Sequence, residues 1–164
     1  MPRWLRHLWT AGVGYSRYFK PADLEEIAQA VAKGERTHRA EIVFAVESHL
    51  HPLAAFKGLT ASARAIEVFS QLKVWDTEEN LGVLIYVLTA ERDVEVVFDR
   101  GLRDTLPAQL PLLIESAVRA IGEGRAGAGM RTLIEALHAL LAAEFPSDVN
   151  SQNIDELPNR AVIL

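Results

Sequence analysis

An almost continuous apolar run, "GVLIYVLT" at residues 82–89, constrains the fold of this chain more than any other feature. A strand that is apolar at nearly every position is buried on both faces, so it belongs in the middle of a covered sheet. Four residues, "AERD", then lead directly into a second strand pattern, "VEVVFD" at residues 94–99. Because so short a connection joins antiparallel neighbours, we predict a β-hairpin that contains the central strand.

Helical patterns lie on both sides of this hairpin in the sequence. Apolar residues recur at helical spacing from Pro21 through "PADLEEIAQAVAKGER", and a second helix begins near Thr60, a good N-cap residue. Between them, "AEIVFAVES" at residues 40–48 is rich in branched and aromatic side chains and predicts the first strand. The helix at Thr60 permits a parallel crossover to the central strand. The stretch "HLHPLAAFKGL" at residues 49–59 is expected to be irregular.

Two further helices are expected between Leu106 and Glu144, and "GEGRAGAG" at residues 122–129 either separates them or marks a weakened helical stretch. The elements together predict an α/β (α+β) sandwich, with a small mixed β-sheet of about four strands flanked by helices. We divide the chain into a basic amphipathic segment (1–20), the domain itself (21–146) and a C-terminal extension (147–164). The extension closes on four apolar residues, so we expect residues 161–164 to dock on the domain as an edge strand.

The N-terminal segment differs in charge from the rest of the chain. Residues 1–20 contain four basic residues and no acidic one, although the whole chain has a formal net charge of −5. In "MPRWLRHLW" the apolar Trp4, Leu5, Leu8 and Trp9 share one helical face, and Arg3, Arg6 and His7 lie elsewhere. This pattern is typical of a helix that lies in a membrane interface. The alternative is a short leading helix that packs on the domain.

Composition and motifs exclude several classes of function. An acidic chain is a poor nonspecific ligand for nucleic acid, and a chain without cysteine has no disulfide or thiolate metal site. "GEGRAG" matches a dinucleotide-binding fingerprint, but it follows a helix where that site needs a strand. We therefore expect no nucleotide, no organic cofactor and no nucleic acid. No apolar run is long enough to span a bilayer, and no signal peptide is expected. A cytoplasmic protein, peripheral to the inner membrane, fits these features.

The histidines give a weaker signal. His49 and His51 alternate by two, but zinc requires further ligands that no spacing in the sequence supplies. We therefore expect both to be exposed loop residues. His138 lies between Leu137 and Leu140 and is expected to face solvent or a polar edge.

Two acidic loops give a better signal. "WDTEEN" at residues 75–80 precedes the central strand, and "FDRGLRD" at residues 98–104 follows its hairpin partner. Antiparallel pairing brings the start of one strand beside the end of the next, so both loops should lie at one edge of the sheet. Oxygen ligands gathered from two loops suit Ca²⁺ or Mg²⁺. The alternative is a set of turn and capping roles, in which Asp76 or Thr77 caps a turn, Gly101 supplies a positive φ and Asp104 or Thr105 caps the helix containing Pro107. In this alternative Arg100 and Arg103 pair with the neighbouring acids.

Four stretches resemble the TPM domain family: "ERTHRAEIVFAVES", "RAIEVFSQLKVWDTEENLGVLIYVL", "RDVEVVFDRGL" and "IEALHALLAAEFP". The likeness covers roughly residues 22–145, and its most specific part holds Arg64, Ala65, Phe69, Thr77 and Asn80. The family includes a thylakoid-lumen protein reported as an acid phosphatase, a photosystem II repair protein and many uncharacterised bacterial proteins, and this chain resembles the soluble bacterial branch. The resemblance implies an α/β sandwich fold and places Asp76, Asn80, Asp99 and Asp104 in loops that bind divalent cations.

Two functions follow as expectations. The first is an accessory module of unproven activity that binds a protein partner, such as a membrane protein, or contacts a membrane through residues 1–20, with Ca²⁺ or Mg²⁺ as its expected ion. The second is a metal-assisted acid phosphatase acting on phosphomonoesters, in which Asp76, Asp99 and Asp104 hold the cation and Arg100 or Arg103 stabilises developing charge. The sequence contains no nucleophile motif, so it leaves open whether the chain is an enzyme.

Overall fold

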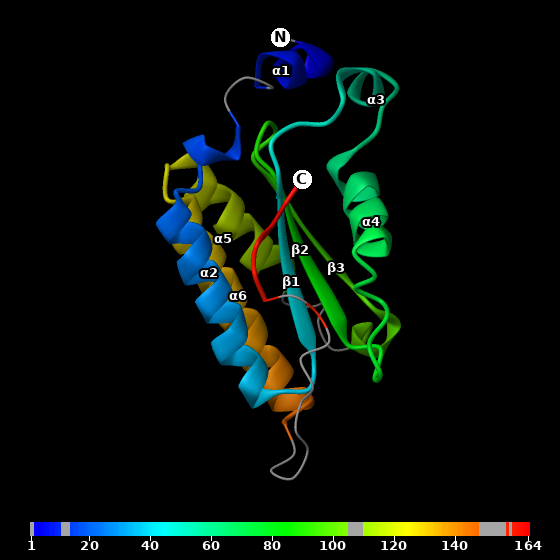
Figure 1. The fold of residues 1–164 in the computed structure, drawn as a ribbon, viewed down its shortest axis with the longest axis vertical. Helices are drawn as coiled ribbons and strands as arrows, with labels where there is room; N and C mark the ends of the chain where they lie inside the picture. Colours follow the sequence, from blue (N-terminus) through cyan, green and yellow to red (C-terminus); the bar gives the residue numbers. More distant parts are fainter. Residues whose placement is uncertain (1, 11–13, 105–109, 148–156, 158) are drawn as a thin grey trace.

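The computed structural model describes residues 2–10, 14–104, 110–147, 157 and 159–164 of the chain. Its centre is a four-stranded mixed sheet with the strand order β3-β2-β1-β4 (Figure 1). The strands are β1 (Glu41–Glu47), β2 (Gly82–Leu88), β3 (Asp93–Phe98) and β4 (Val162–Ile163).

The strand pairing confirms the predicted hairpin and crossover. β1 pairs in parallel with β2, from Glu41 opposite Gly82 to Glu47 opposite Leu88, and α4 (Ala61–Gln71) lies between them in the chain. β2 pairs antiparallel with β3. β4 pairs in parallel with the outer side of β1, so the apolar C-terminus is the predicted edge strand.

Helices cover both faces of the sheet (Figure 1). One face carries α2 (Pro21–Gly34), α5 (Leu110–Gly122) and α6 (Ala126–Glu144), and the other carries α4. Thr60 caps α4 as predicted, because its side-chain oxygen accepts from the Ala63 N–H at 3.1 Å. The short helices α1 (Arg3–Thr10) and α3 (Pro52–Phe56) lie side by side at one end of the molecule. Three 3₁₀ helices complete the described part: η1 (Tyr15–Arg17), η2 (Glu35–Thr37) and η3 (Arg100–Leu102).

The sheet separates two hydrophobic cores, which explains why β1 and β2 are apolar at nearly every position. Ile42 and Phe44 of β1 face the larger core under α2, α5 and α6. Val43 and Ala45 alternate with them and face the smaller core under α4. All seven residues of β1 and of β2 are buried. This double burial confirms the predicted α/β sandwich.

Two local predictions need correction. The stretch at residues 49–59 is not wholly irregular, because Pro52 begins α3 and the His51 ring accepts from the Leu53 N–H at 3.3 Å. The glycine-rich stretch does not lie wholly between helices, since α6 already begins at Ala126. Gly129 therefore lies inside α6. A glycine is needed at this position because α5 approaches closely: an added Cβ would lie 2.5 Å from the Ala120 Cβ.

Two further points concern helix ends and membranes. The predicted helix start near Pro107, with its cap at Asp104, falls on residues 105–109, outside the described residues, and α5 is described from Leu110. Among the residues that the structure describes, no helix combines the length and the apolar character needed to cross a membrane.

Candidate functional site

The two acidic loops meet at one edge of the sheet, as strand pairing predicts. The Asp99 N–H donates to the Gly82 carbonyl at 2.9 Å, and the Gly101 N–H donates to the Asn80 carbonyl at 3.2 Å. Asn80 has a positive φ of 58°, a conformation that asparagine tolerates better than most residues. The residues before β2 and after β3 therefore form one hydrogen-bonded corner.

Arg100 occupies the middle of this corner. Its guanidinium donates to the Asn80 side-chain oxygen from Nε at 3.2 Å and from Nη2 at 2.8 Å. Asp99 does not pair with that guanidinium; its Oδ1 accepts from the Arg100 backbone N–H at 2.7 Å and caps η3. Asp99 Oδ2 is buried and has no hydrogen-bond partner. One carboxylate oxygen at this corner is thus available to a ligand.

The other predicted ligands are not drawn into the corner. Asp76 and Asp104 are exposed, and within the described residues no hydrogen bond or ion pair joins either side chain to Asn80 or Asp99. The described residues also contain no group of three or more His, Asp or Glu side chains placed to hold a metal ion. The corner offers hard oxygen donors that suit Ca²⁺ or Mg²⁺, but only Asn80 and Asp99 are brought together.

Turn and capping roles account for much of the two loops. The Thr77 hydroxyl oxygen accepts from the Leu81 N–H at 3.1 Å, as predicted for a turn cap. The predicted positive φ at Gly101 is wrong, because in the described chain only Gly14, Gly58 and Gly124 among glycines have one. Gly101 is required for closeness: an added Cβ would lie 2.6 Å from the Asn80 carbonyl oxygen.

A buried histidine pair lies elsewhere at the same end of the sheet and corrects the prediction for His138. The His138 ring is buried against His38, with ring centroids 4.9 Å apart and 2.6 Å between His38 Nε2 and His138 Nδ1. Because the Ala40 N–H donates to His38 Nδ1 at 3.2 Å, His38 carries its proton on Nε2 and donates it to His138. Burial lowers the pKa of His38 to about 4, and burial together with the neighbouring His38 lowers the pKa of His138 to about 4.

A second buried polar cluster lies under α4 and was not predicted. Arg64 of α4 pairs with Glu47 at the end of β1, from Nε to Oε2 at 2.9 Å and from Nη2 to Oε1 at 3.2 Å. The Tyr86 hydroxyl of β2 donates to the same Glu47 Oε2 at 2.6 Å. Burial and the adjacent Glu47 carboxylate raise the pKa of Tyr86, and hydrogen bonding to Glu47 raises the pKa of Arg64. The cluster joins two strands to the helix that covers them.

The sequence profile of the TPM domain family matches residues 13–140, most of the chain. The chain belongs to the TPM domain family. Arg64 lies within the matched residues, and in this TPM domain it forms the ion pair with Glu47.

Two solved structures share the fold of this TPM domain. The BA42 protein from the psychrophilic bacterium Bizionia argentinensis, solved by NMR, has 24% sequence identity and a TM-score of 0.76, covering 89% of this chain and 95% of that one. The N-terminal domain of the cg2496 protein from Corynebacterium glutamicum has 13% identity and a TM-score of 0.60, covering 84% and 82%. No curated protein matches the chain.

The N-terminal helix of the TPM domain packs on the body through polar side chains. His7 is fully buried; its Nδ1 accepts from the Leu50 N–H at 3.1 Å, so its Nε2 donates to Glu91 Oε1 at 2.6 Å. Arg3 donates to the same Glu91 oxygen at 2.6 Å. The packed alternative is therefore confirmed, with His7 as the anchor in place of the apolar residues.

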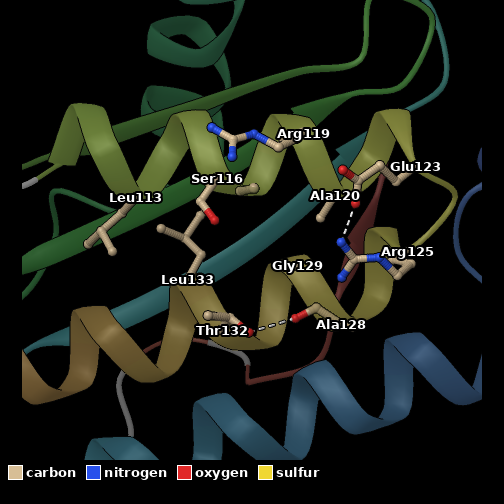
Figure 2. A pocket seen from close by; sticks show the side chains of 11 residues that line it. Leu113, Ser116, Arg119, Ala120, Glu123, Arg125, Ala128, Gly129, Thr132 and Leu133 are labelled. Carbon is tan, nitrogen blue, oxygen red and sulfur yellow. Dashed lines mark hydrogen bonds and ion pairs between the residues drawn. The ribbon is translucent and has the colours of Figure 1, made fainter.

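A groove of about 300 Å³ runs between α5 and α6 of the TPM domain (Figure 2). Arg119, Arg125 and Glu123 line it, together with small residues such as Gly129. Its charges are compensated locally, because Arg125 pairs with Glu123 and Arg119 with Glu115 at 3.3 Å. A groove whose cations already have carboxylate partners offers a charged ligand little, so we do not assign it a binding function.

Proposed function

We propose that this TPM domain is an accessory module that docks on an anionic membrane surface through α1 and α3. The observation that carries the proposal is the exposure of four large apolar side chains on these neighbouring helices. Trp4 is 37% exposed and Leu8 53% on α1, and Leu53 is 63% exposed and Phe56 71% on α3. These four side chains form the apolar tip.

The orientation of α1 supports this role. Trp4 and Leu8 are four residues apart and so lie on the same side of the helix, and both are exposed whereas His7 is fully buried. A helix that served only to stabilise the fold would bury them, with a gain of roughly 1.5–3 kcal/mol for each large apolar side chain. The hydrogen bonds of His7 to Glu91 and Leu50 instead hold the helix with these side chains outward.

Charge favours an anionic surface as the occupant. Residues 1–20 carry +4, so the rest of the chain carries −9, from a total of −5. Basic residues near an anionic bilayer contribute about 1 kcal/mol each. Tryptophan favours the membrane–water interface, and an apolar surface flanked by arginines is typical of interfacial helices. A protein partner, the other expected occupant, is an outcome of the test below.

Flotation with lipid vesicles tests the proposal. The full chain should float with phosphatidylcholine vesicles containing phosphatidylserine, and less so as salt rises or when phosphatidylserine is omitted. The double variant Leu8→Asp/Phe56→Asp should lose this binding, whereas Leu112→Asp, at a 72% exposed site on α5, should retain it. Absence of flotation, or equal flotation of the two variants, rejects membrane docking. If the wild type then captures a protein that the double variant does not, the apolar tip binds a protein partner.

A second candidate function is binding of Ca²⁺ or Mg²⁺ at the corner between the two acidic loops. It is supported by two oxygens of this corner: the buried Asp99 Oδ2, which has no hydrogen-bond partner, and the side-chain oxygen of Asn80, which accepts from Arg100. The cation would displace the Arg100 guanidinium from Asn80 and draw in Asp76 and Asp104. Titration with each ion, followed by amide NMR shifts, should locate saturable changes at residues 76–104. Asp99→Asn should abolish them and Asp23→Asn should not; unchanged spectra reject the site.

Acid phosphatase activity on phosphomonoesters is the catalytic extension of this second candidate. A bound cation would polarise the phosphate, with Asp99 and Asp76 as its carboxylate ligands. Arg100, once released from Asn80, or Arg103 would stabilise the developing charge. Purified protein should then hydrolyse p-nitrophenyl phosphate only with the cation, and Asp99→Asn should remove the activity. Turnover that persists in this variant or without metal contradicts the assignment.

A further inference from the structure

A basic pocket of about 490 Å³ lies where α1, η1 and the turn between β2 and β3 come together. Its lining consists of three arginines with one tyrosine, one alanine and one glutamate: Arg6, Arg17, Arg92, Tyr18, Ala90 and Glu91. Three segments that are distant in the sequence therefore each contribute one guanidinium. The proposed functions use none of these arginines as a ligand.

The charge of this basic pocket is not compensated by its single acid. Glu91 Oε1 already accepts from Arg3 and from His7, both at 2.6 Å. Within the part of the chain that the structure describes, no carboxylate pairs with Arg17 or Arg92. The lining carries +3 from its arginines and −1 from Glu91, and Arg3 cancels that single negative charge. Cations gathered in this way repel one another unless an anion lies between them.

The walls of the basic pocket are fixed by backbone hydrogen bonds. In the hairpin turn, the Ala90 N–H donates to the Ser48 carbonyl at 3.0 Å and the Arg92 N–H donates to the Thr89 carbonyl at 3.2 Å. Arg92 holds a positive φ of 54°, which sets the direction of its side chain. In η1, the Tyr18 N–H donates to the Tyr15 carbonyl at 2.9 Å. The backbone positions of Tyr18, Ala90 and Arg92 are therefore fixed, so binding an anion would order only the arginine side chains, which limits the entropy cost of binding.

The basic pocket is separate from both sites considered above. At 100° per residue, Arg6 points to the opposite flank of α1 from Trp4 and Leu8. The β2–β3 turn lies at the other end of the hairpin from Asn80 and Asp99. This is the end at which β1 and β2 finish, and open α/β sheets bind their ligands outside the carboxyl ends of parallel strands.

We propose that the basic pocket binds a phosphomonoester dianion. Such a group has three terminal oxygens and a charge approaching −2. It matches the guanidinium groups of Arg17 and Arg92, which have no carboxylate partner in the described part of the chain, better than a single carboxylate would. The volume admits more than a bare phosphate, so the ligand is the phosphate of a larger molecule. That molecule is either a small metabolite or a lipid with a phosphomonoester headgroup.

NMR titration of the full chain with inorganic phosphate and with glycerol 3-phosphate, at constant ionic strength and without divalent metal, tests the proposal. Saturable shifts are expected at the amides of residues 17–18 and 90–92, with tighter binding of glycerol 3-phosphate. Arg17→Gln and Arg92→Gln should each weaken binding about tenfold or more, the loss expected for one charged hydrogen bond. Arg119→Gln, an exposed arginine on α5, should leave it unchanged. Equal weakening by Arg119→Gln overturns the proposal, since it indicates nonspecific charge attraction.

A vesicle arm separates the two sources of the phosphate. Vesicles with phosphatidic acid are compared with phosphatidylserine vesicles of equal surface charge, using the wild type and Arg17→Gln/Arg92→Gln. A preference for phosphatidic acid that this variant loses identifies the lipid headgroup; soluble binding without that preference identifies a free phosphomonoester. Binding in neither arm overturns the proposal. The soluble arm does not depend on membrane docking, and the variant retains the apolar tip, so failure of the basic pocket is distinguishable from failure of membrane docking.

Discussion

The two ends of the sheet bury their polar groups in different ways. Where β1 and β2 finish, carboxylates form ion pairs with arginines, Glu47 with Arg64 and Glu91 with Arg3, and the neutral ring of His7 also donates to Glu91. Where the same strands begin, the histidine pair is neutral, since burial lowers both pKa values to about 4. Nearby, Arg100 binds an amide oxygen and no carboxylate. The finishing end is therefore held by ion pairs between carboxylates and arginines. The starting end combines the neutral histidine pair with the buried carboxylates of Glu35 and Glu41, and Arg39 pairs with Glu79 at its surface.

This difference corresponds to a difference in role: the proposed binding surfaces lie at the finishing end, and the starting end serves mainly to close the fold. The ion pairs at the finishing end attach α1 and α4 to the strands, and the apolar tip and the basic pocket lie at that end. The starting end is closed by short turns, and its predicted metal ligands are largely solvent-exposed or engaged in capping. We expect the finishing end to respond to the removal of single charges and the starting end to respond to acid.

Glu47→Gln is expected to have the largest effect on stability. The change leaves the partly buried guanidinium of Arg64 beside a neutral amide, and losing the charged partner of such hydrogen bonds costs about 3 kcal/mol, to which the weakened hydrogen bond from the Tyr86 hydroxyl adds. Urea denaturation should show this decrease in the free energy of unfolding. Glu115→Gln removes an exposed carboxylate paired with Arg119 and should change stability by less than about 0.5 kcal/mol. Similar losses in the two variants would mean that the Glu47 pair is not effectively buried.

Acid should destabilise the starting end through the histidine pair. The ordinary histidine pKa of 6.5 applies to the unfolded chain, whereas His38 and His138 have pKa values of about 4 in the folded protein. Between these values the unfolded chain binds more protons, so the stability present above pH 6.5 is lost as the pH falls toward 4. Protonation of one histidine of the pair corresponds to a decrease of roughly 3 kcal/mol in the free energy of unfolding.

The free energy of unfolding, measured at several values between pH 7 and pH 4, gives the slope of stability against pH and so checks this prediction. The double variant His38→Phe/His138→Leu should show a smaller slope whatever its absolute stability. His51→Gln, at an exposed histidine, should keep the wild-type slope. If the double variant retains the full slope, groups other than this histidine pair govern the acid response. Asp93 and Glu95 are not among them, because their raised pKa values make the folded protein bind protons more tightly and so oppose acid destabilisation.

The sequence predicts the sheet because its signals are local. Residues 82–99 contain a buried strand, a short turn and a second strand, and each can be recognised within about ten residues. The edge strand at residues 161–164 was predictable for the same reason, from a terminal apolar run. The corner formed by Asn80 and Asp99 follows from strand pairing alone, which is why two of the four predicted ligands meet there.

The buried polar contacts were not predictable because each joins residues far apart in the sequence. His38 and His138 are separated by 100 positions, and His7 and Glu91 by 84. The periodicity of α1 favours its apolar side as the packed face, but the hydrogen bonds of His7 determine the rotation instead. Glu47 gave one usable signal: a charged residue ending an otherwise apolar strand requires a buried partner.

Gly101→Ala should produce an intermediate effect at the starting end. Its Cβ would lie 2.6 Å from the Asn80 carbonyl oxygen, so the corner must open, at a cost of about 2 kcal/mol. Gly122→Ala is the matched change, because it meets nothing within 4 Å at the end of α5 and should be neutral or slightly stabilising. Thermal unfolding of both variants compares them directly. A neutral Gly101→Ala would show that the contact between the two loops is not tightly packed.

Removing the predicted metal ligands one at a time should give the smallest effects and should divide them into two classes. Asp99→Ala removes the cap on the Arg100 N–H and should cost about 1 kcal/mol. Asp76→Ala and Asp104→Ala remove exposed carboxylates and should each change stability by less than about 0.5 kcal/mol. The measurement is unfolding in chelator and again in excess Ca²⁺. If Asp76→Ala reduces a calcium-dependent gain in stability as much as Asp99→Ala does, the two loops form a single cation site. If only Asp99→Ala does so, the site is confined to the corner beside Asn80.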